Sequence, residues 1–334
     1  MKISISKRVN NNIYFDRGLT DIVKLLCCLL VAASHYAQHC IVVNNHEGFL
    51  LKLLAAQGGY LGVAIFFFLS GYGVMNSLTR KSISFVDFAK KRLSKVYIPA
   101  VSISVFWIFL LCLFPDIHQT ELGLSEPISW SNILGSLINV FLFKFADSVL
   151  WFIAVIMLLY IVVFVYAKLK ATRFSHYRWL VLLFLTLAVT VFTYYTVAPF
   201  ASVSVFAFSF GVVLCDYNSQ ISSHATLFCI IVFCAISFLF LKGRHDMVII
   251  HGLVNYLVIL LWVYLSSKYN IQLLNVPPII AALSYDIYLI HKKVLVVLFT
   301  LQPSASMVIF FTFVIVVSLI VNRIRKININ GWSK

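Results

Sequence analysis

The stretch SVLWFIAVIMLLYIVVFVYA (148–167) contains no charged residue. A helix that crosses a bilayer needs about 20 consecutive, mostly apolar residues, and this stretch meets that requirement. Similar stretches lie on both sides of it along the chain, so the sequence predicts ten transmembrane helices. The predicted spans are 19–43, 58–79, 96–114, 147–167, 179–197, 199–217, 224–241, 247–266, 278–299 and 304–322.

The composition of the 334-residue chain favours the same class of fold. The chain is 62% apolar and 11% charged, whereas soluble domains are about 45–50% apolar and about 25% charged. Its 30 Phe, 16 Tyr and 6 Trp need a larger core than a soluble chain of this length can form. We therefore predict an all-α, polytopic membrane protein with a single membrane-embedded domain over 1–334.

The Lys and Arg residues predict the orientation of this domain. The net charge is +15, but the basic residues separate long apolar stretches, which is typical of cytoplasmic loops rather than of a nucleic-acid-binding surface. With a cytoplasmic N-terminus, the predicted inside segments hold 19 Lys and Arg residues and the outside segments hold 4. We predict that both ends are cytoplasmic, as a segment at 1–18 and a tail at 323–334, with membrane lipid and no nucleic acid as partner.

Two segments have alternative interpretations. Ala32-Ala33-Ser34 resembles the cleavage region of a signal peptide, but the apolar stretch continues beyond it, which favours a retained span. Residues 131–145 are amphipathic and short, so we expect them to lie at the membrane interface or to re-enter the membrane.

Ionisable residues inside spans are costly in lipid and are therefore candidates for function. Asp21 and Lys24 are one helical turn apart and can form an ion pair. Lys24 and His35 are eleven residues apart, so they lie within about 20° of the same helix face and about 16 Å apart along the axis. We interpret this stripe as functional; the alternative for His35 is a structural hydrogen bond between helices. The ionisable residues that fall within spans are Asp21, Lys24, His35, His39, Asp216, His251, Asp286 and His291.

Other local patterns predict no metal, disulfide or serine nucleophile. His35 and His39 have a spacing that suits a metal, but the sequence offers no third ligand. The seven cysteines include no C-x-x-C pair. Gly58 and Gly62 form a G-x-x-x-G pair that predicts close helix packing. Ser70-Gly71 lacks the G-x-S-x-G frame of a nucleophile elbow.

The most basic segment is RKSISFVDFAKKRLSK (80–95). Arg92 and Lys95 lie one helical turn apart directly before the third predicted span. Two cations in this position can hold a phosphorylated ligand at the membrane edge. The alternative is that the segment only sets the topology.

Five segments in order make the chain similar to the acyltransferase-3 family of integral-membrane O-acyltransferases, over residues 15 to about 300. Trp151-Phe152 opens the fourth span in this pattern. The other four are FDRGLTDIVKLLCCLLVAASHYAQH (15–39), GYLGVAIFFFLSGYGV (59–74), FAKKRLSKVYIP (88–99) and LSYDIYLIHKKV (283–294).

This resemblance implies transfer of an acyl group, expected to be acetyl, from cytoplasmic acyl-coenzyme A to a hydroxyl of a glycan or lipid-linked saccharide of the cell envelope. It implies a multi-pass protein of the bacterial inner (plasma) membrane, with acyl-CoA as a co-substrate and no tightly bound cofactor. By position, His35 is the catalytic histidine, acting as a base or as a transient acyl carrier. Lys24, Arg92 and Lys95 fall where the family usually has arginines, and they are expected to bind the phosphates of coenzyme A. The supporting residues are Asp21, Ser70, Gly71, Asp286 and His291.

Two points stay open at the level of sequence. The sequence identifies no acidic partner for His35, and a lysine is an alternative partner for Asp286. The alternative function is a membrane transporter or polysaccharide exporter, because intramembrane charges also mark transport paths. A transporter needs no phosphate-binding cations, and the chain lacks the repeated halves that many transporters show.

Overall fold

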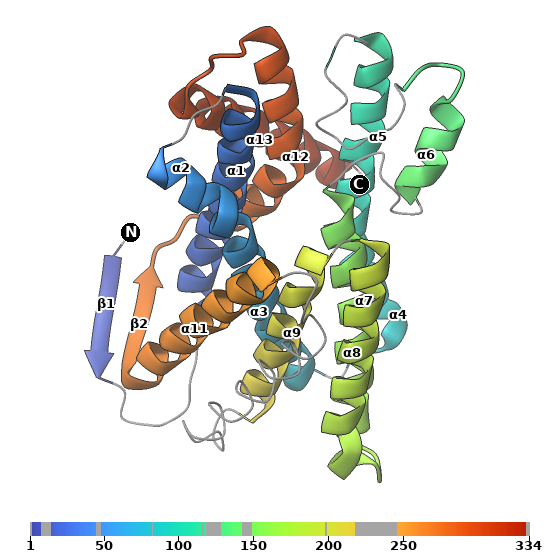
Figure 1. Ribbon diagram of the computed structural model, residues 1–334. Coiled ribbons are helices and arrows are strands. Elements are labelled where there is room, and N and C mark those ends of the chain that lie inside the picture. The colour runs from blue at the N-terminus through green and yellow to red at the C-terminus, as the bar shows by residue number, and fades with distance from the viewer. Residues whose placement is uncertain are drawn as a thin grey trace.

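The computed structural model describes residues 2–7, 15–44, 48–81, 83–114, 117, 128–141, 149–197, 199–217 and 246–331. Within these residues, seven helical segments are long and apolar enough to cross a membrane. This identifies an integral membrane protein, and Figure 1 shows its helices packed side by side. The seven candidate spans are Arg17–Val42, Phe49–Arg80, Phe85–Leu113, Leu150–Leu169, Ser175–Thr196, Ile250–Lys268 and Met307–Arg325.

The helices follow one another in the order that the apolar stretches predict. Their bounds are α1 (Arg17–Asn44), α2 (Phe49–Leu53), α3 (Gly59–Arg80), α4 (Phe85–Arg92), α5 (Ile98–Leu113), α6 (Ile133–Phe141), α7 (Leu150–Leu169), α8 (Arg178–Thr196), α9 (Pro199–Asp216), α11 (Asp246–Lys268), α12 (Ile279–Leu301) and α13 (Met307–Gly331). A 3₁₀ turn, η4 (Ser175–Tyr177), precedes α8.

Nine of the ten predicted spans coincide with described helices, and the tenth, 224–241, lies outside the described residues. Two of the nine are not among the seven candidate spans. The apolar part of α9 is shorter than the others, and α12 carries Asp286, Lys292 and Lys293. With nine residues, α6 extends only about 14 Å, so it is too short to cross, in agreement with the expectation for 131–145.

Two segments that the sequence did not mark as irregular are π-helices. They are η1 (Leu54–Gly58), which joins α2 to α3, and η2 (Leu93–Tyr97), which joins α4 to α5. A π-helix closes its hydrogen bonds from i to i+5, so it changes the direction of the side chains that follow it, and such turns occur frequently at functional sites. η2 contains Lys95 and directly follows Arg92, and η1 contacts Ser34 and Gln38, which flank His35 on α1.

The fold agrees with the all-α prediction apart from one short pair of strands that the sequence did not predict. β1 (Lys2–Lys7) pairs antiparallel with β2 (Tyr269–Leu274), with Lys2 opposite Leu274 and Lys7 opposite Tyr269. The two strands lie beside α11 at one edge of the molecule (Figure 1). In the ten-span prediction eight spans separate these segments, and an even number leaves both on one side of the membrane, as their pairing requires.

The centre of the bundle is α3, which packs against α1, α7, α9 and α11. Glycines allow this close approach. A Cβ atom added to Gly71 would lie 2.0 Å from the carbonyl oxygen of Phe208 in α9, and one added to Gly62 would lie 2.7 Å from that of Cys27 in α1. The predicted packing role of the G-x-x-x-G pair is confirmed at Gly62.

The orientation can be tested at two exposed turns. Ala171 lies between α7 and α8, and Ser304 lies between α12 and α13; both are exposed. In Ser304→Cys cells an impermeant maleimide should label the protein from outside, whereas Ala171→Cys should react only after permeabilisation. Equal labelling of both variants in intact cells would contradict the predicted orientation.

Candidate functional site

The structure brings together two histidines that are far apart in the sequence. His35 lies on α1 and His291 on α12, and their rings stack with centroids 5.3 Å apart and planes inclined by 22°. His35 is half-buried, whereas His291 is only 1% exposed. The pair therefore has one member that a substrate can reach and one that is enclosed by protein.

The hydrogen bonds of His291 fix its tautomer. Its Nδ1 atom lies 2.7 Å from the carbonyl oxygen of Tyr288 and 3.2 Å from that of Ile287. A carbonyl oxygen only accepts hydrogen bonds, so Nδ1 carries the proton and donates it. The Nε2 atom then has a lone pair, and it is buried without a hydrogen-bond partner among the described residues.

The other residues of the LSYDIYLIHKKV segment hold α12 against its neighbours. The hydroxyl of Tyr285 donates to the carbonyl oxygen of Val96 in η2, and that of Tyr288 donates to the carbonyl oxygen of Val149 at 3.4 Å. Tyr285, Tyr288 and His291 thus link α12 to η2, to the start of α7 and to α1. This arrangement explains why two tyrosines and a histidine occur at these spacings.

His35 has a neutral hydrogen-bond partner. Its Nδ1 atom lies 3.2 Å from Oε1 of Gln38, one turn further along α1. The Nε2 atom of Gln38 in turn donates to the carbonyl oxygen of Ala55 in η1, at 3.0 Å. Sequence reasoning sought an acidic partner and missed Gln38, although its i+3 spacing from His35 was a signal.

Lys24 lies on the same helix as His35 and is half-buried. Its Nζ atom is 5.8 Å from the centre of the Phe66 ring of α3, and the charges of Asp21 and Arg92 both act on it. Asp21 forms an ion pair with Arg17, with 3.8 Å between Nε and Oδ2. Lys24 and Arg92, which lie on separate helices, thus form part of one cationic region.

Arg92 and Lys95 differ in their surroundings. The guanidinium carbon of Arg92 lies 5.2 Å from the ring centre of Phe88 and 4.9 Å from that of Tyr160. Its Nε atom is buried and has no hydrogen-bond partner within the described part of the chain. Lys95 is exposed on η2. Because η2 is a π-helix, which takes more residues per turn, Arg92 and Lys95 are less closely aligned than the same spacing in an α-helix would make them.

A small apolar cavity lies between the cationic region and the histidine pair. Phe66 lines it and also contacts Lys24. Val31 and Tyr288 line it one turn before His35 and His291, respectively. The full lining is Cys27, Cys28, Val31, Gly62, Val63, Phe66, Phe152 and Tyr288.

Two predicted supporting residues belong to helix packing. Ser70 and Gly71 are buried on α3, and Gly71 meets the backbone of α9 at Phe208. This contact lies on α9 and not on α1 or α12, which carry the histidine pair. His39, for its part, packs with its ring centre 3.9 Å from that of Phe299, and the described residues contain no group of three potential metal ligands.

Asp286 is bound by α13 and not by the lysine that sequence reasoning considered. Arg325 Nη1 lies 2.9 Å from Oδ1, Arg325 Nη2 lies 3.0 Å from Oδ2, and Asn322 donates to Oδ2 at 2.9 Å. The sequence predicted that residues 323–334 form a cytoplasmic tail outside the helices. Instead α13 continues to Gly331, so Arg325 lies on this helix beside Asp286. Asp286 therefore anchors α13 to α12.

Removing this carboxylate should destabilise the protein. Asp286 is fully buried and Arg325 is 24% exposed, so Asp286→Leu should lower the free energy of unfolding by about 3–5 kcal/mol, the usual effect of breaking a buried pair. Unfolding by detergent titration, followed by tryptophan fluorescence, measures the loss. The double variant Asp286→Leu/Arg325→Leu removes both charges and should recover much of it. A single variant as stable as the wild type would contradict this role.

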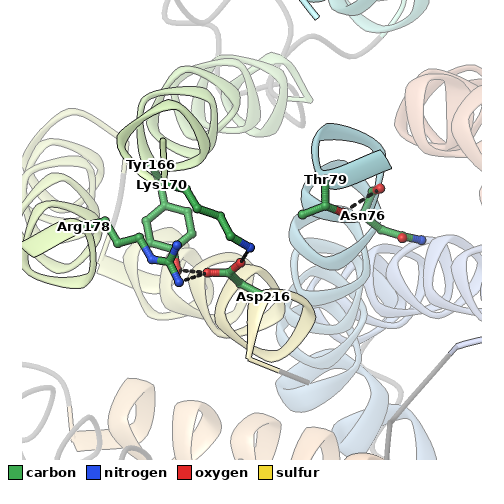
Figure 2. Close-up of polar contacts among 6 residues, drawn as sticks. All are labelled: Asn76, Thr79, Tyr166, Lys170, Arg178 and Asp216. Atoms are coloured by element: carbon green, nitrogen blue, oxygen red, sulfur yellow. Dashed lines mark hydrogen bonds and ion pairs between the residues drawn. The ribbon is translucent and has the colours of Figure 1, made fainter. Parts of the chain in front are cut away.

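Asp216 is a second buried carboxylate that binds several helices together, and the sequence did not predict this role. Figure 2 shows Lys170, which directly follows α7, and Arg178 of α8 converging on Asp216, the last residue of α9. The distances are 2.9 Å from Lys170 Nζ and 2.8 Å from Arg178 Nη2, and the Tyr166 hydroxyl donates at 2.7 Å. With three donors on one carboxylate, this cluster fastens the ends of α7, α8 and α9 together.

A further polar cluster joins η1 and α3 to α11. Gln57 Oε1 accepts a hydrogen bond from Nδ1 of His251, and Gln57 Nε2 donates to Asn255 Oδ1 at 2.8 Å. The His251 ring stacks on Tyr60, with centroids 4.7 Å apart. Among the residues that form this cluster, His251 alone was identified from the sequence, because amides and a tyrosine carry no charge that marks them.

The fold and this site define an integral membrane protein with a histidine pair in its helical core and a cationic region that includes Lys24, on the same helix as His35. A family model described as an acyltransferase domain matches residues 20–322, nearly the whole chain. The chain therefore belongs to the acyltransferase-3 family, and the resemblance seen in the sequence is confirmed. No match was found among curated proteins or among solved structures.

Proposed function

We propose that this membrane acyltransferase transfers an acyl group, acetyl in the simplest case, from cytoplasmic acyl-CoA to a hydroxyl of an envelope glycan or lipid-linked saccharide. Its place of action is the inner (plasma) membrane of a bacterium. The observation that carries the proposal is the order of three features along α1: the cationic region, the apolar cavity and the histidine pair. Family membership supports the acyl transfer itself.

The cationic region is the proposed site for the phosphates of acyl-CoA. Lys24 and Arg92 contribute positive charges that are close enough to act on each other, and exposed Lys95 adds a third cation. Hydrogen bonds between cations and phosphate are about twice as strong as neutral ones. The unpartnered, buried Nε of Arg92 supports this assignment because a phosphate oxygen would satisfy it.

The cavity marks the proposed path of the pantetheine arm; it has room for about one water molecule in this structure and must widen when acyl-CoA binds. Lys24 and His35 are separated by about 16 Å of helix rise, a distance comparable with the length of that arm. The cavity between them is lined by apolar side chains and two thiols, which suit a largely uncharged chain. Phosphates held near Lys24 would leave the thioester beside His35.

The reaction then needs two proton transfers, one to His35 and one from it. The acceptor hydroxyl oxygen attacks the thioester carbonyl carbon, so that a C–O bond forms and the C–S bond breaks. His35 takes the hydroxyl proton on its ring nitrogen and returns it to the sulfur, which leaves as the free thiol of coenzyme A. General-base catalysis of this kind typically contributes about 10²–10⁴ in rate.

Exposure decides which histidine acts as the base in this proposal. His291 is 1% exposed and its Nδ1 proton is held by backbone carbonyls. His35 is half-buried and is open to an acceptor. We therefore assign the proton transfer to His35, and we assign to His291 the role of holding the His35 ring by stacking.

Purified protein in liposomes tests the proposal. With acetyl-CoA and a lipid-linked saccharide, coenzyme A thiol should be released only when both are present, and the saccharide should gain a base-labile acetyl group. A transporter or exporter would move the saccharide and release no thiol. Translocation without acetylation would therefore favour that alternative.

A further inference from the structure

We infer that Gln38 is a positioning residue that holds His35 in the tautomer with its proton on Nδ1, so that Nε2 is the atom that takes a proton from the acceptor. The catalytic consequence rests on the proposed function, but the tautomer itself follows from hydrogen bonding alone.

The carbonyl oxygen of Ala55 fixes the orientation of the Gln38 amide. It lies 3.0 Å from the Nε2 atom of Gln38, and a carbonyl oxygen can only accept a hydrogen bond. The NH₂ group of Gln38 must therefore face Ala55. Ser34 Oγ, 3.4 Å from the same NH₂ group, accepts a second hydrogen bond from it.

With the amide fixed, its oxygen faces His35. Gln38 Oε1 lies 3.2 Å from the Nδ1 atom of His35, and an amide oxygen also only accepts. Neutral His35 must then carry its proton on Nδ1, which leaves the lone pair on Nε2. A flip of the amide would place two acceptors together at Ala55, so the opposite tautomer of His35 loses one of the two hydrogen bonds in either orientation of the amide.

The π-helix η1 holds the carbonyl group of Ala55, which orients Gln38. Ala55 belongs to η1, which ends at Gly58, and α3 begins at Gly59. Both glycines lie close to Ser34 of α1: a Cβ atom added to Gly58 or Gly59 would lie 3.3 or 3.2 Å from it. This close contact between η1 and α1 keeps the carbonyl of Ala55 within reach of Gln38. His291 has the same tautomer, but there a backbone carbonyl of the same helix, that of Tyr288, accepts the hydrogen bond from Nδ1.

Kinetics of two variants test this role, and both should fold because Gln38 is exposed. Gln38→Leu removes the acceptor and should lower kcat about 10–100-fold, the usual effect of losing the partner that orients a functional histidine. The KM for acyl-CoA should stay within about twofold, since the cationic region is untouched. Gln38→Glu keeps an acceptor oxygen for Nδ1–H but loses the donor to Ala55, so its kcat should lie between those of the wild type and Gln38→Leu.

The matched control is Gln302→Leu, the same change at the exposed end of α12, which should leave kcat unchanged. A Gln38→Leu variant with wild-type kcat, or a Gln38→Glu variant as inactive as Gln38→Leu, would overturn the inference.

A spectroscopic measurement separates this inference from the proposed function. In protein labelled with ¹⁵N-histidine, the His35 ring signals are assigned by their loss in His35→Gln. The wild type should show the proton on Nδ1, and Gln38→Leu should show a mixture of tautomers. A proton on Nε2 in the wild type would overturn the inference whatever the activity. The expected tautomer in a protein that transfers no acyl group would refute the proposed function and leave the inference intact.

Discussion

His35→Gln should be as inactive as His35→Ala, with acyl transfer lowered by about 10²–10⁴-fold, the usual contribution of a general base. Glutamine keeps a hydrogen-bonding group but cannot take up a proton near neutral pH, whereas imidazole has an unperturbed pKa of about 6.5. Both variants should insert into the membrane and bind acyl-CoA, since the cationic region is unchanged. Acyl transfer by the purified variants in liposomes measures the effect.

The matched control for this prediction is His39→Gln. His39 lies one turn further along α1, and its ring packs on Phe299. This variant should retain activity within a few-fold. Substantial activity in His35→Gln would contradict the catalytic assignment, because interhelical hydrogen bonds are worth only about 0.6–2 kcal/mol and glutamine can replace one.

Arg92→Ala should raise the KM for acyl-CoA by about 10–100-fold, in line with about 1.5–3 kcal/mol for a hydrogen bond to a charged group. Arg92 is half-buried between Phe88 and Tyr160, so its charge is less screened than that of Lys95, which is exposed. Lys95→Ala should therefore have the smaller effect, and Lys95→Arg should be tolerated. Steady-state kinetics of the purified variants at varied acyl-CoA concentration gives the KM of each.

Lys90→Ala is the control for the cationic region. Lys90 is exposed and lies about 200° around α4 from Phe88, so it faces away from Arg92. Its removal should leave KM unchanged. If the double variant Arg92→Ala/Lys95→Ala bound acyl-CoA as the wild type does, these two residues would have no part in donor binding.

The spans and the stripe on α1 could be predicted because both depend on local sequence. Apolar length alone gives the helices, and α1 is continuous from Arg17 to Asn44, so the common face of Lys24 and His35 follows from helix geometry. Pro199 marks the start of α9, as expected of a residue that suits the first turn of a helix.

The contacts between helices could not be predicted in this way. The stacking of His35 on His291 depends on the packing of α1 against α12, and the pairing of Asp286 with Arg325 depends on how far α13 extends. The π-helix η2 breaks the regular spacing that aligned Arg92 with Lys95. The β1–β2 pair joins segments that lie far apart in the sequence, and no local pattern specifies such a contact.

Mass spectrometry of envelope glycans tests the proposed acyl transfer most directly. Glycans are compared from cells that lack this gene and from the same cells carrying either the wild-type gene or His35→Gln. The proposal predicts a base-labile gain of one acetyl group with the wild-type gene and none with His35→Gln, at equal protein levels. Identical glycans in all three strains, or equal acetylation with His35→Gln, would contradict it.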